Sequence, residues 1–109
     1  MSHYKIKPCK LSEADHISLK SILELCQKRL NTPWQLIEQG QADLYIYSFN
    51  NPDSLAAFNQ HNTGFSALIS NDDTAIDNVD IVLKKPLRAN NFAQVLNKIE
   101  EKIKFNSQA

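Results

Sequence analysis

The chain has 109 residues, of which 42% are hydrophobic, and its twelve basic residues balance its twelve acidic ones. This length suits a single modest core, so we expect residues 1–109 to form one domain. A net charge of zero gives no general attraction for nucleic acid or for an anionic membrane. No apolar run approaches the ~20 residues of a membrane span, and the first residues lack the apolar segment of a signal peptide, which predicts a cytoplasmic protein.

The first predicted elements are a short strand at residues 4–7 and a helix that begins after Ser12. Ser12 can cap this helix, and Asp15 can return a bond to the Ser12 amide, as in a capping box. The expected end of the helix is near residues 30–31. Its apolar residues recur at i, i+3, i+4, i+7 and i+11, which makes one buried face: Leu19, Ile22, Leu23, Cys26 and Leu30.

Short apolar runs in the middle of the chain predict buried strands at residues 44–47, 66–69 and 81–83. Asn51 and Pro52 occupy the preferred cap and first positions of a short helix. Residues 34–37 alternate like a strand, yet the preceding Thr32 and Pro33 also suit a helix start. We favour the strand.

The last predicted helix repeats the spacing of the first one, with Asn91 as its cap. Glu100 and Lys104 are four residues apart and are expected to support each other on its solvent face. Its apolar face consists of Phe92, Val95, Leu96, Ile99 and Ile103.

The element order β-α-β-β-α-β-β-α predicts an α/β fold. We expect a three-layer sandwich in which helices cover both faces of a mostly parallel five-stranded sheet. The residues expected in its core include Leu23, Ile46, Leu68, Val82 and Ile99.

The cysteines and histidines do not form a recognisable site. Cys9 and Cys26 are far apart, and such cysteines usually stay reduced and pack as small hydrophobic groups. His3, His16 and His61 lie in three separate regions without the local spacing of a zinc site. We therefore expect neither a metal nor another cofactor.

Residues at three strand ends resemble bacterial response-regulator receiver domains, the family that includes CheY-like proteins. One buried strand ends at Ser48, another at Ser70, and a third at Lys85 before Pro86. In receivers the corresponding positions hold the phosphoacceptor aspartate, a serine or threonine, and a lysine that contacts the phosphoryl group. The resemblance implies a compact, flavodoxin-like architecture, but with Ser48 in place of the acceptor.

Other departures from the receiver pattern also concern its chemistry. Receivers hold a metal through an acidic pair after the first strand, where this chain has Lys7 and Lys10. Asp43 comes at the start of its strand, which is the wrong end for that site. Phosphoryl transfer to a carboxylate needs both the carboxylate and the metal. The links at 38–42 and 71–79 are also short for crossovers between parallel strands. Either the receiver helices there are reduced to turns, or the sheet is rearranged.

These departures favour a non-catalytic, stand-alone pseudo-receiver that acts as a signalling adaptor through protein–protein interaction. The resemblance places its partner surface at Lys84, Pro86, Leu87 and Arg88 and on the outer face of the last helix. Alternatively, Leu87 simply packs beneath that helix. The partner is either another signalling protein of unknown identity or a second copy of the chain.

Two other functions remain open at this stage. Ser48, Ser70 and Lys85 could serve a small enzyme or a ligand-binding module at the strand ends, since serine–lysine pairs catalyse acyl transfer. The chain has only two glycines, which argues against a phosphate-cradling loop. The other alternative is a domain like an anti-sigma-factor antagonist, for which Ser54 is the nearest phosphorylatable serine.

Overall fold

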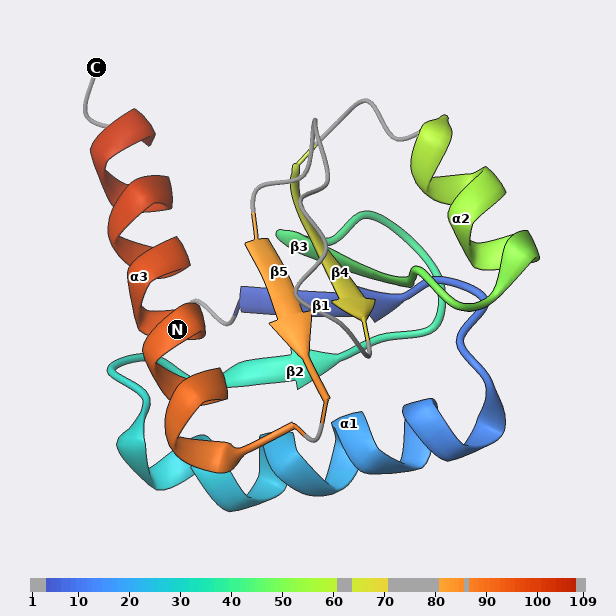
Figure 1. Cartoon of the computed structure of the whole chain (residues 1–109). Coiled ribbons are helices and arrows are strands. Elements are labelled where there is room, and N and C mark those ends of the chain that lie inside the picture. The colour runs from blue at the N-terminus through green and yellow to red at the C-terminus, as the bar shows by residue number, and fades with distance from the viewer. Residues whose placement is uncertain (1–3, 61–63, 71–80, 86, 108–109) are drawn as a thin grey trace.

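The helices and strands follow one another in the predicted order (Figure 1). The computed structural model describes residues 4–60, 64–70, 81–85 and 87–107. Its elements are β1 (Tyr4–Pro8), α1 (Glu13–Cys26), the 3-10 turn η1 (Gln27–Arg29), β2 (Trp34–Leu36), β3 (Leu44–Ser48), α2 (Pro52–Asn59), β4 (Phe65–Ser70), β5 (Ile81–Lys84) and α3 (Ala89–Ser107). The segment 34–36 is a strand, as we favoured.

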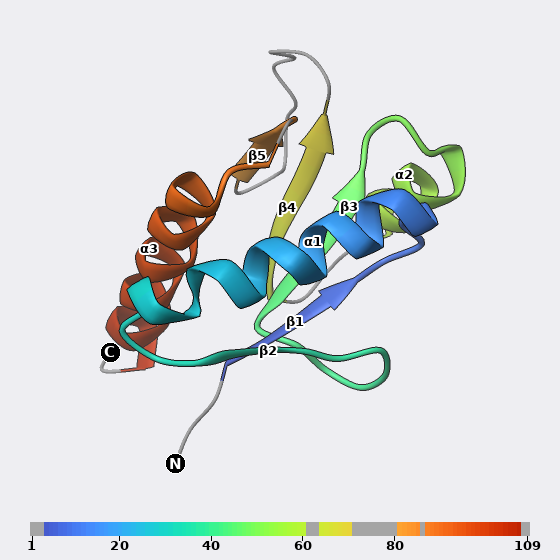
Figure 2. The ribbon, with the colours of Figure 1, turned by 90° about the horizontal axis from the view of Figure 1, so that it is seen from below.

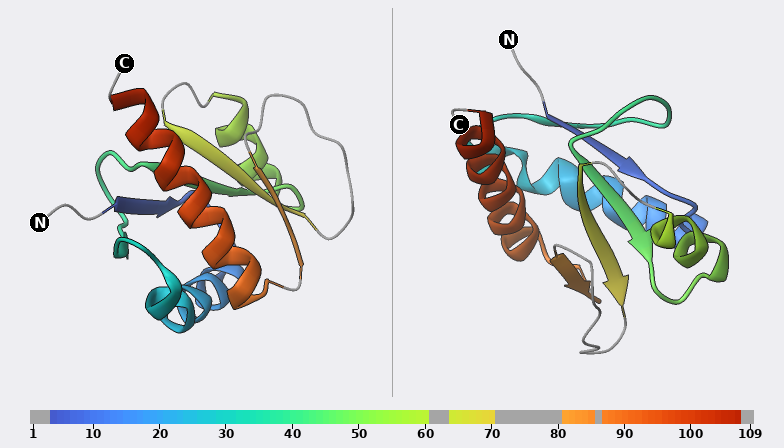
Figure 3. Two further views of the ribbon diagram at one scale, coloured as in Figure 1. Left: turned by 90° about the vertical axis from the view of Figure 1, so that its left-hand side faces the viewer. Right: turned by 90° about the horizontal axis from the view of Figure 1, so that it is seen from above.

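The five strands are all parallel and lie in the order β2-β1-β3-β4-β5. This is the doubly wound order of flavodoxin-like folds. Helices α1 and α3 lie side by side on one face of the sheet, and α2 packs on the other (Figures 2 and 3). The predicted three-layer α/β sandwich is therefore confirmed.

The short link between β2 and β3 crosses β1 without a helix, and β2 and β3 still lie on opposite sides of β1. Its two ends are held to β1 by backbone bonds: Ile37 N–H donates to Ile6 O and Asp43 N–H to Lys5 O, each at 2.9 Å. The Asp43 carboxylate also accepts from Lys5 N–H at 2.8 Å. Gly40 turns the chain with a φ of +96°, a conformation that glycine adopts without strain. The crossover between β2 and β3 is thus made by a turn, while the second short link lies outside the described residues.

The main core lies between the sheet and the two helices α1 and α3. The predicted apolar faces of both helices point into it, and their buried members are Leu19, Leu23, Cys26, Phe92, Leu96 and Ile99. A smaller core under α2 contains Tyr47, Phe58 and Leu68, with the Tyr47 and Phe58 rings 5.5 Å apart. Within the described residues, no helix combines the length and apolar character needed to cross a bilayer.

Four of the five predicted core residues are buried, but Val82 is 38% exposed. Its strand β5 is at the edge of the sheet, where Ile81 and Leu83 pack into the main core. Alternate side chains of a strand point to opposite faces, so Val82 points away from α3. The prediction treated a half-covered edge strand as one that is buried on both faces.

The predicted start of α1 is right about Ser12, but the role of Asp15 and the end of the helix need correction. Ser12 caps the helix, because its Oγ accepts from Asp15 N–H at 3.2 Å. The Asp15 carboxylate, however, pairs with Lys85. The α-helix also ends earlier than predicted, at Cys26, and continues as a 3-10 turn to Arg29.

Two predictions about α3 were wrong. The helix begins at Ala89, so Asn91 lies inside its first turn and is not its cap. Glu100 is buried, not on the solvent face, and its Oε1 has no hydrogen-bond partner among the described residues. One turn earlier on α3, Asn97 binds Arg29 O and Asn31 N–H at 3.1 Å each. Residues 29–31 thus contact α3 at Asn97, and the helical period alone does not predict this contact.

Candidate functional site

The carboxyl ends of the strands bring the three predicted site residues to one edge of the sheet. Ser48 is in register with Ile69 in β4, one residue before Ser70. Ser70 is in register with Lys84 of β5, and Lys85 N–H donates to Ser70 O at 3.0 Å. Ligands of open α/β sheets bind outside this edge, so it is the first place to look for a site.

The serines of this edge are directed into the protein. Ser48 and Ser70 are each only 1% exposed. The fully buried Ser54 of α2 accepts from Ser48 N–H at 2.7 Å and donates to Cys9 O at 2.6 Å. The Ser54 hydroxyl therefore joins the ends of β1 and β3. In this fold the hydroxyl is buried and hydrogen-bonded, and it is not exposed as a phosphorylatable serine would be.

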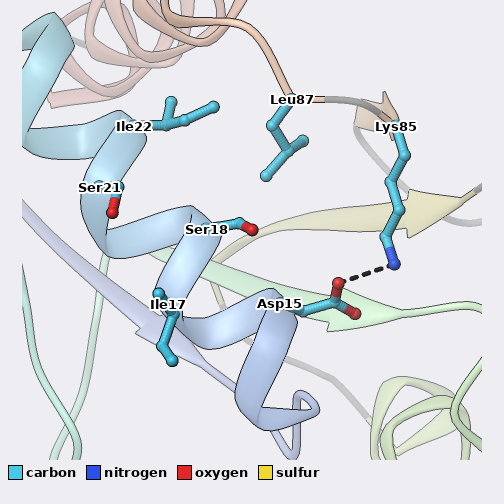
Figure 4. Close-up of a pocket in the computed structure, with 7 residues that line it drawn as sticks. All are labelled: Asp15, Ile17, Ser18, Ser21, Ile22, Lys85 and Leu87. Atoms are coloured by element: carbon cyan, nitrogen blue, oxygen red, sulfur yellow. Dashed lines mark ion pairs between the residues drawn. The ribbon is translucent and has the colours of Figure 1, made fainter.

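Lys85 is held by an ion pair that the sequence did not reveal. Its Nζ lies 2.7 Å from Oδ1 of Asp15, and the two side chains are 33% and 13% exposed (Figure 4). Asp15 is in the first turn of α1, where the cap at Ser12 starts the helix beside this edge. The lysine that would contact a phosphoryl group in a receiver is thus paired with a carboxylate of its own chain. The only sequence signal for Asp15 was its place in the cap, which suggested a different partner.

A cavity of about 580 Å³ adjoins this ion pair, between α1 and the segment that leads into α3. Figure 4 shows Ile22 and Leu87 pointing toward each other across it, with Ser18 between them. Neither Ser48 nor Ser70 belongs to its lining, which consists of Asp15, Ile17, Ser18, Ser21, Ile22, Lys85 and Leu87. The hollow at this edge is therefore mostly apolar, with one neutralised charge pair at its end.

The predicted partner surface contains a second hollow, of about 190 Å³, between β5 and the start of α3. Lys84 and Arg88 are exposed at this surface, whereas Leu87 is half-buried and also packs against the main core. Pro86 lies outside the described residues. The lining consists of Val82, Leu83, Lys84, Leu87, Arg88, Asn91, Phe92 and Val95. Leu87 contributes to both hollows, so packing beneath α3 does not remove it from the surface.

The thiols have the properties of packed side chains. Burial raises the pKa of both Cys9 and Cys26. Burial, together with the neighbouring Cys9, also raises the pKa of Tyr47. Thiolates are the nucleophilic form of cysteine, so both thiols are poor nucleophiles at neutral pH. In the part of the chain that the structure describes, no three side chains of His, Cys, Asp or Glu gather to hold a metal.

Acetyl phosphate with magnesium should leave the protein unmodified. Ser48 offers a buried hydroxyl instead of a carboxylate, and phosphoryl transfer requires an accessible nucleophile. Intact-mass spectrometry should detect no phosphoryl adduct, and beryllofluoride with magnesium should not change Trp34 fluorescence. An authentic receiver treated in parallel is the control. A stable adduct on this chain would contradict the prediction.

Sequence comparisons add no family assignment. No protein-family model matches the chain, and no curated protein matches it at a significant level. The likeness to receivers therefore depends on the strand order and on the residues at the strand ends.

Proposed function

We propose that this chain is a non-catalytic, receiver-like adaptor that works in the cytoplasm by binding another signalling protein. The observation that carries the proposal is the closed carboxyl edge. Ser48 and Ser70 are buried there, and Asp15 neutralises Lys85. Receiver chemistry needs an accessible acceptor carboxylate at this edge, and the acceptor position here holds a buried serine. Surface recognition is therefore the function that the geometry favours.

The surface that best suits a partner is the hollow between β5 and α3. Half-buried Leu87 and Val95 line it, and Val82 at its rim is 38% exposed. Arg88 is exposed beside it, and none of the described carboxylates pairs with it. Protein interfaces are enriched in arginine and combine an apolar centre with a polar rim. This composition favours a protein partner with an acidic group at the edge of its contact surface.

Charge reversal at Arg88 should weaken partner binding without affecting the fold. The Arg88→Glu variant replaces a cation at the hollow with a repelling charge, while the exposed side chain takes no part in the core. Wild type and variant should be used as baits in native cell extract, with captured proteins identified by mass spectrometry. Lys98→Glu is the matched control, because Lys98 is an exposed cation elsewhere on α3.

The expected result is a protein captured by the wild type and by Lys98→Glu but not by Arg88→Glu, with equal melting temperatures for all three. Equal capture by Arg88→Glu would exclude this surface. The alternative of a ligand-binding module would be favoured by a different result: a small molecule that raises the melting temperature of wild type but not of a Lys85→Met variant.

A further inference from the structure

Helix α1 carries a second stripe of small and apolar residues on the side opposite its core face. Its buried face contains Leu19, Leu23 and Cys26. On the other side Ile17 is 56% exposed and Leu25 is 70% exposed. The exposed positions of this stripe recur every three or four residues, which places them along one line of the helix: Ala14, Ile17, Ser18, Ser21 and Leu25.

The order of residues on this stripe is self-complementary about Ser21. Ile17 precedes Ser21 by four residues and Leu25 follows it by four. If a second α1 packs antiparallel with its Ser21 opposite the first, each Ile17 faces a Leu25. The small Ser21 at the crossing lets the helices approach closely. A symmetric dimer requires such an arrangement, in which one patch meets its own copy.

The charges at the two ends of the stripe fit the same arrangement. Glu13 lies in the first turn of α1, Arg29 lies in the 3-10 turn η1 that follows the helix, and both are exposed. In the antiparallel pair, the acidic first turn of α1 in each copy comes near the basic η1 turn of the other. Lys28 adds a second cation at the same end. A parallel arrangement would instead place like charges together, which interfaces disfavour.

The cavity beside α1 provides a place for the protruding Leu25 of such a second copy. Ile17, Ser18, Ser21 and Ile22 line the cavity of about 580 Å³ from α1, and Leu87 lies opposite them (Figure 4). The antiparallel register sets Leu25 of the second copy over Ile17 and Ser21, at the mouth of this cavity. The two-fold symmetry repeats the contact, so that two leucines enter two apolar hollows.

We propose that a second copy of this chain occupies the α1 cavity, through antiparallel pairing of the two α1 helices about Ser21. The contact involves one helix and one hollow per copy, which belongs to the small class of interfaces below about 1,200 Å². The dimer should therefore be reversible and dependent on concentration. The proposal does not rest on the adaptor function, because its contacts come from α1 and the cavity beside it, whereas Arg88 lines only the hollow between β5 and α3.

Analytical ultracentrifugation over a series of concentrations tests the dimer. The wild-type mass should rise from that of a monomer toward that of a dimer. Leu25→Glu should weaken dimerisation about tenfold or more, as expected for an anchor residue removed from its pocket. Phe105→Glu is the matched control, since Phe105 is 76% exposed at the far end of α3, and it should dimerise like wild type. A wild type that stays monomeric, or a dimer unaffected by Leu25→Glu, would overturn the proposal.

A charge exchange tests the antiparallel register. Glu13→Arg and Arg29→Glu, each alone, place like charges opposite each other and should weaken dimerisation several-fold. An equimolar mixture of these two variants should form a heterodimer, because the arginine introduced in one variant then faces the glutamate introduced in the other, and the two unchanged charges also face each other as opposites. Circular dichroism melting confirms that both variants are folded. A mixture no more associated than its separate components would exclude this register.

Discussion

Replacing Ile46 with alanine should lower the free energy of unfolding by about 2–5 kcal/mol, the range for a large aliphatic side chain removed from a packed core. Ile46 is fully buried in β3, at the centre of the sheet. Val82→Ala on the edge strand should cost about 1 kcal/mol or less, because much of that side chain already contacts water. Urea denaturation with a fitted m value gives both numbers.

The matched comparison within β3 is Ser48→Ala. Ser48 is as deeply buried as Ile46, but its contact with Ser54 is made by the backbone N–H, which alanine retains. The free energy of unfolding should therefore fall much less in Ser48→Ala than in Ile46→Ala. Equal losses for the two variants would mean that the Ser48 hydroxyl has a structural or functional role that its visible contacts do not explain.

Ser54→Ala should lower the free energy of unfolding by about 2–4 kcal/mol, a large loss for a small polar residue. Removing the hydroxyl leaves Ser48 N–H and Cys9 O without their partner, and each orphaned buried group costs about 1–3 kcal/mol. Thermal and urea unfolding measure the effect. Ser21→Ala on the exposed side of α1 is the control and should change stability very little. A loss for Ser54→Ala no greater than that of the control would show that water replaces the hydroxyl.

The elements of this fold could be predicted because their signals are local. The helical period identified the buried faces of α1 and α3, and short apolar runs identified the strands. The errors came from neighbours that are remote in the sequence. Val82 is exposed because β5 lies at an edge, and Glu100 is buried although the helical pattern placed it on the solvent face. Neither fact is encoded within a few residues of the side chain concerned.

The candidate site was likewise predictable only in part. The strand ends predicted that Ser48, Ser70 and Lys85 would share one edge, because parallel strands end together. The contacts of the side chains there were not predictable. Lys85 meets Asp15 from a helix seventy residues earlier in the chain. The role of Ser54 depends on α2 folding back onto two strands at once.

Because the two cores differ in size, the free energy of local unfolding differs between parts of this protein. Helix α2 is attached through a small cluster at Phe58 and through the hydroxyl of Ser54, whereas α1 and α3 share the large core. Segments with few buried contacts detach at free energies well below that of global unfolding. When α2 lifts, Cys9 and Tyr47 lose the cover that it provides. The end of β3 at Ser48, which Ser54 covers in the folded state, is then open to solvent.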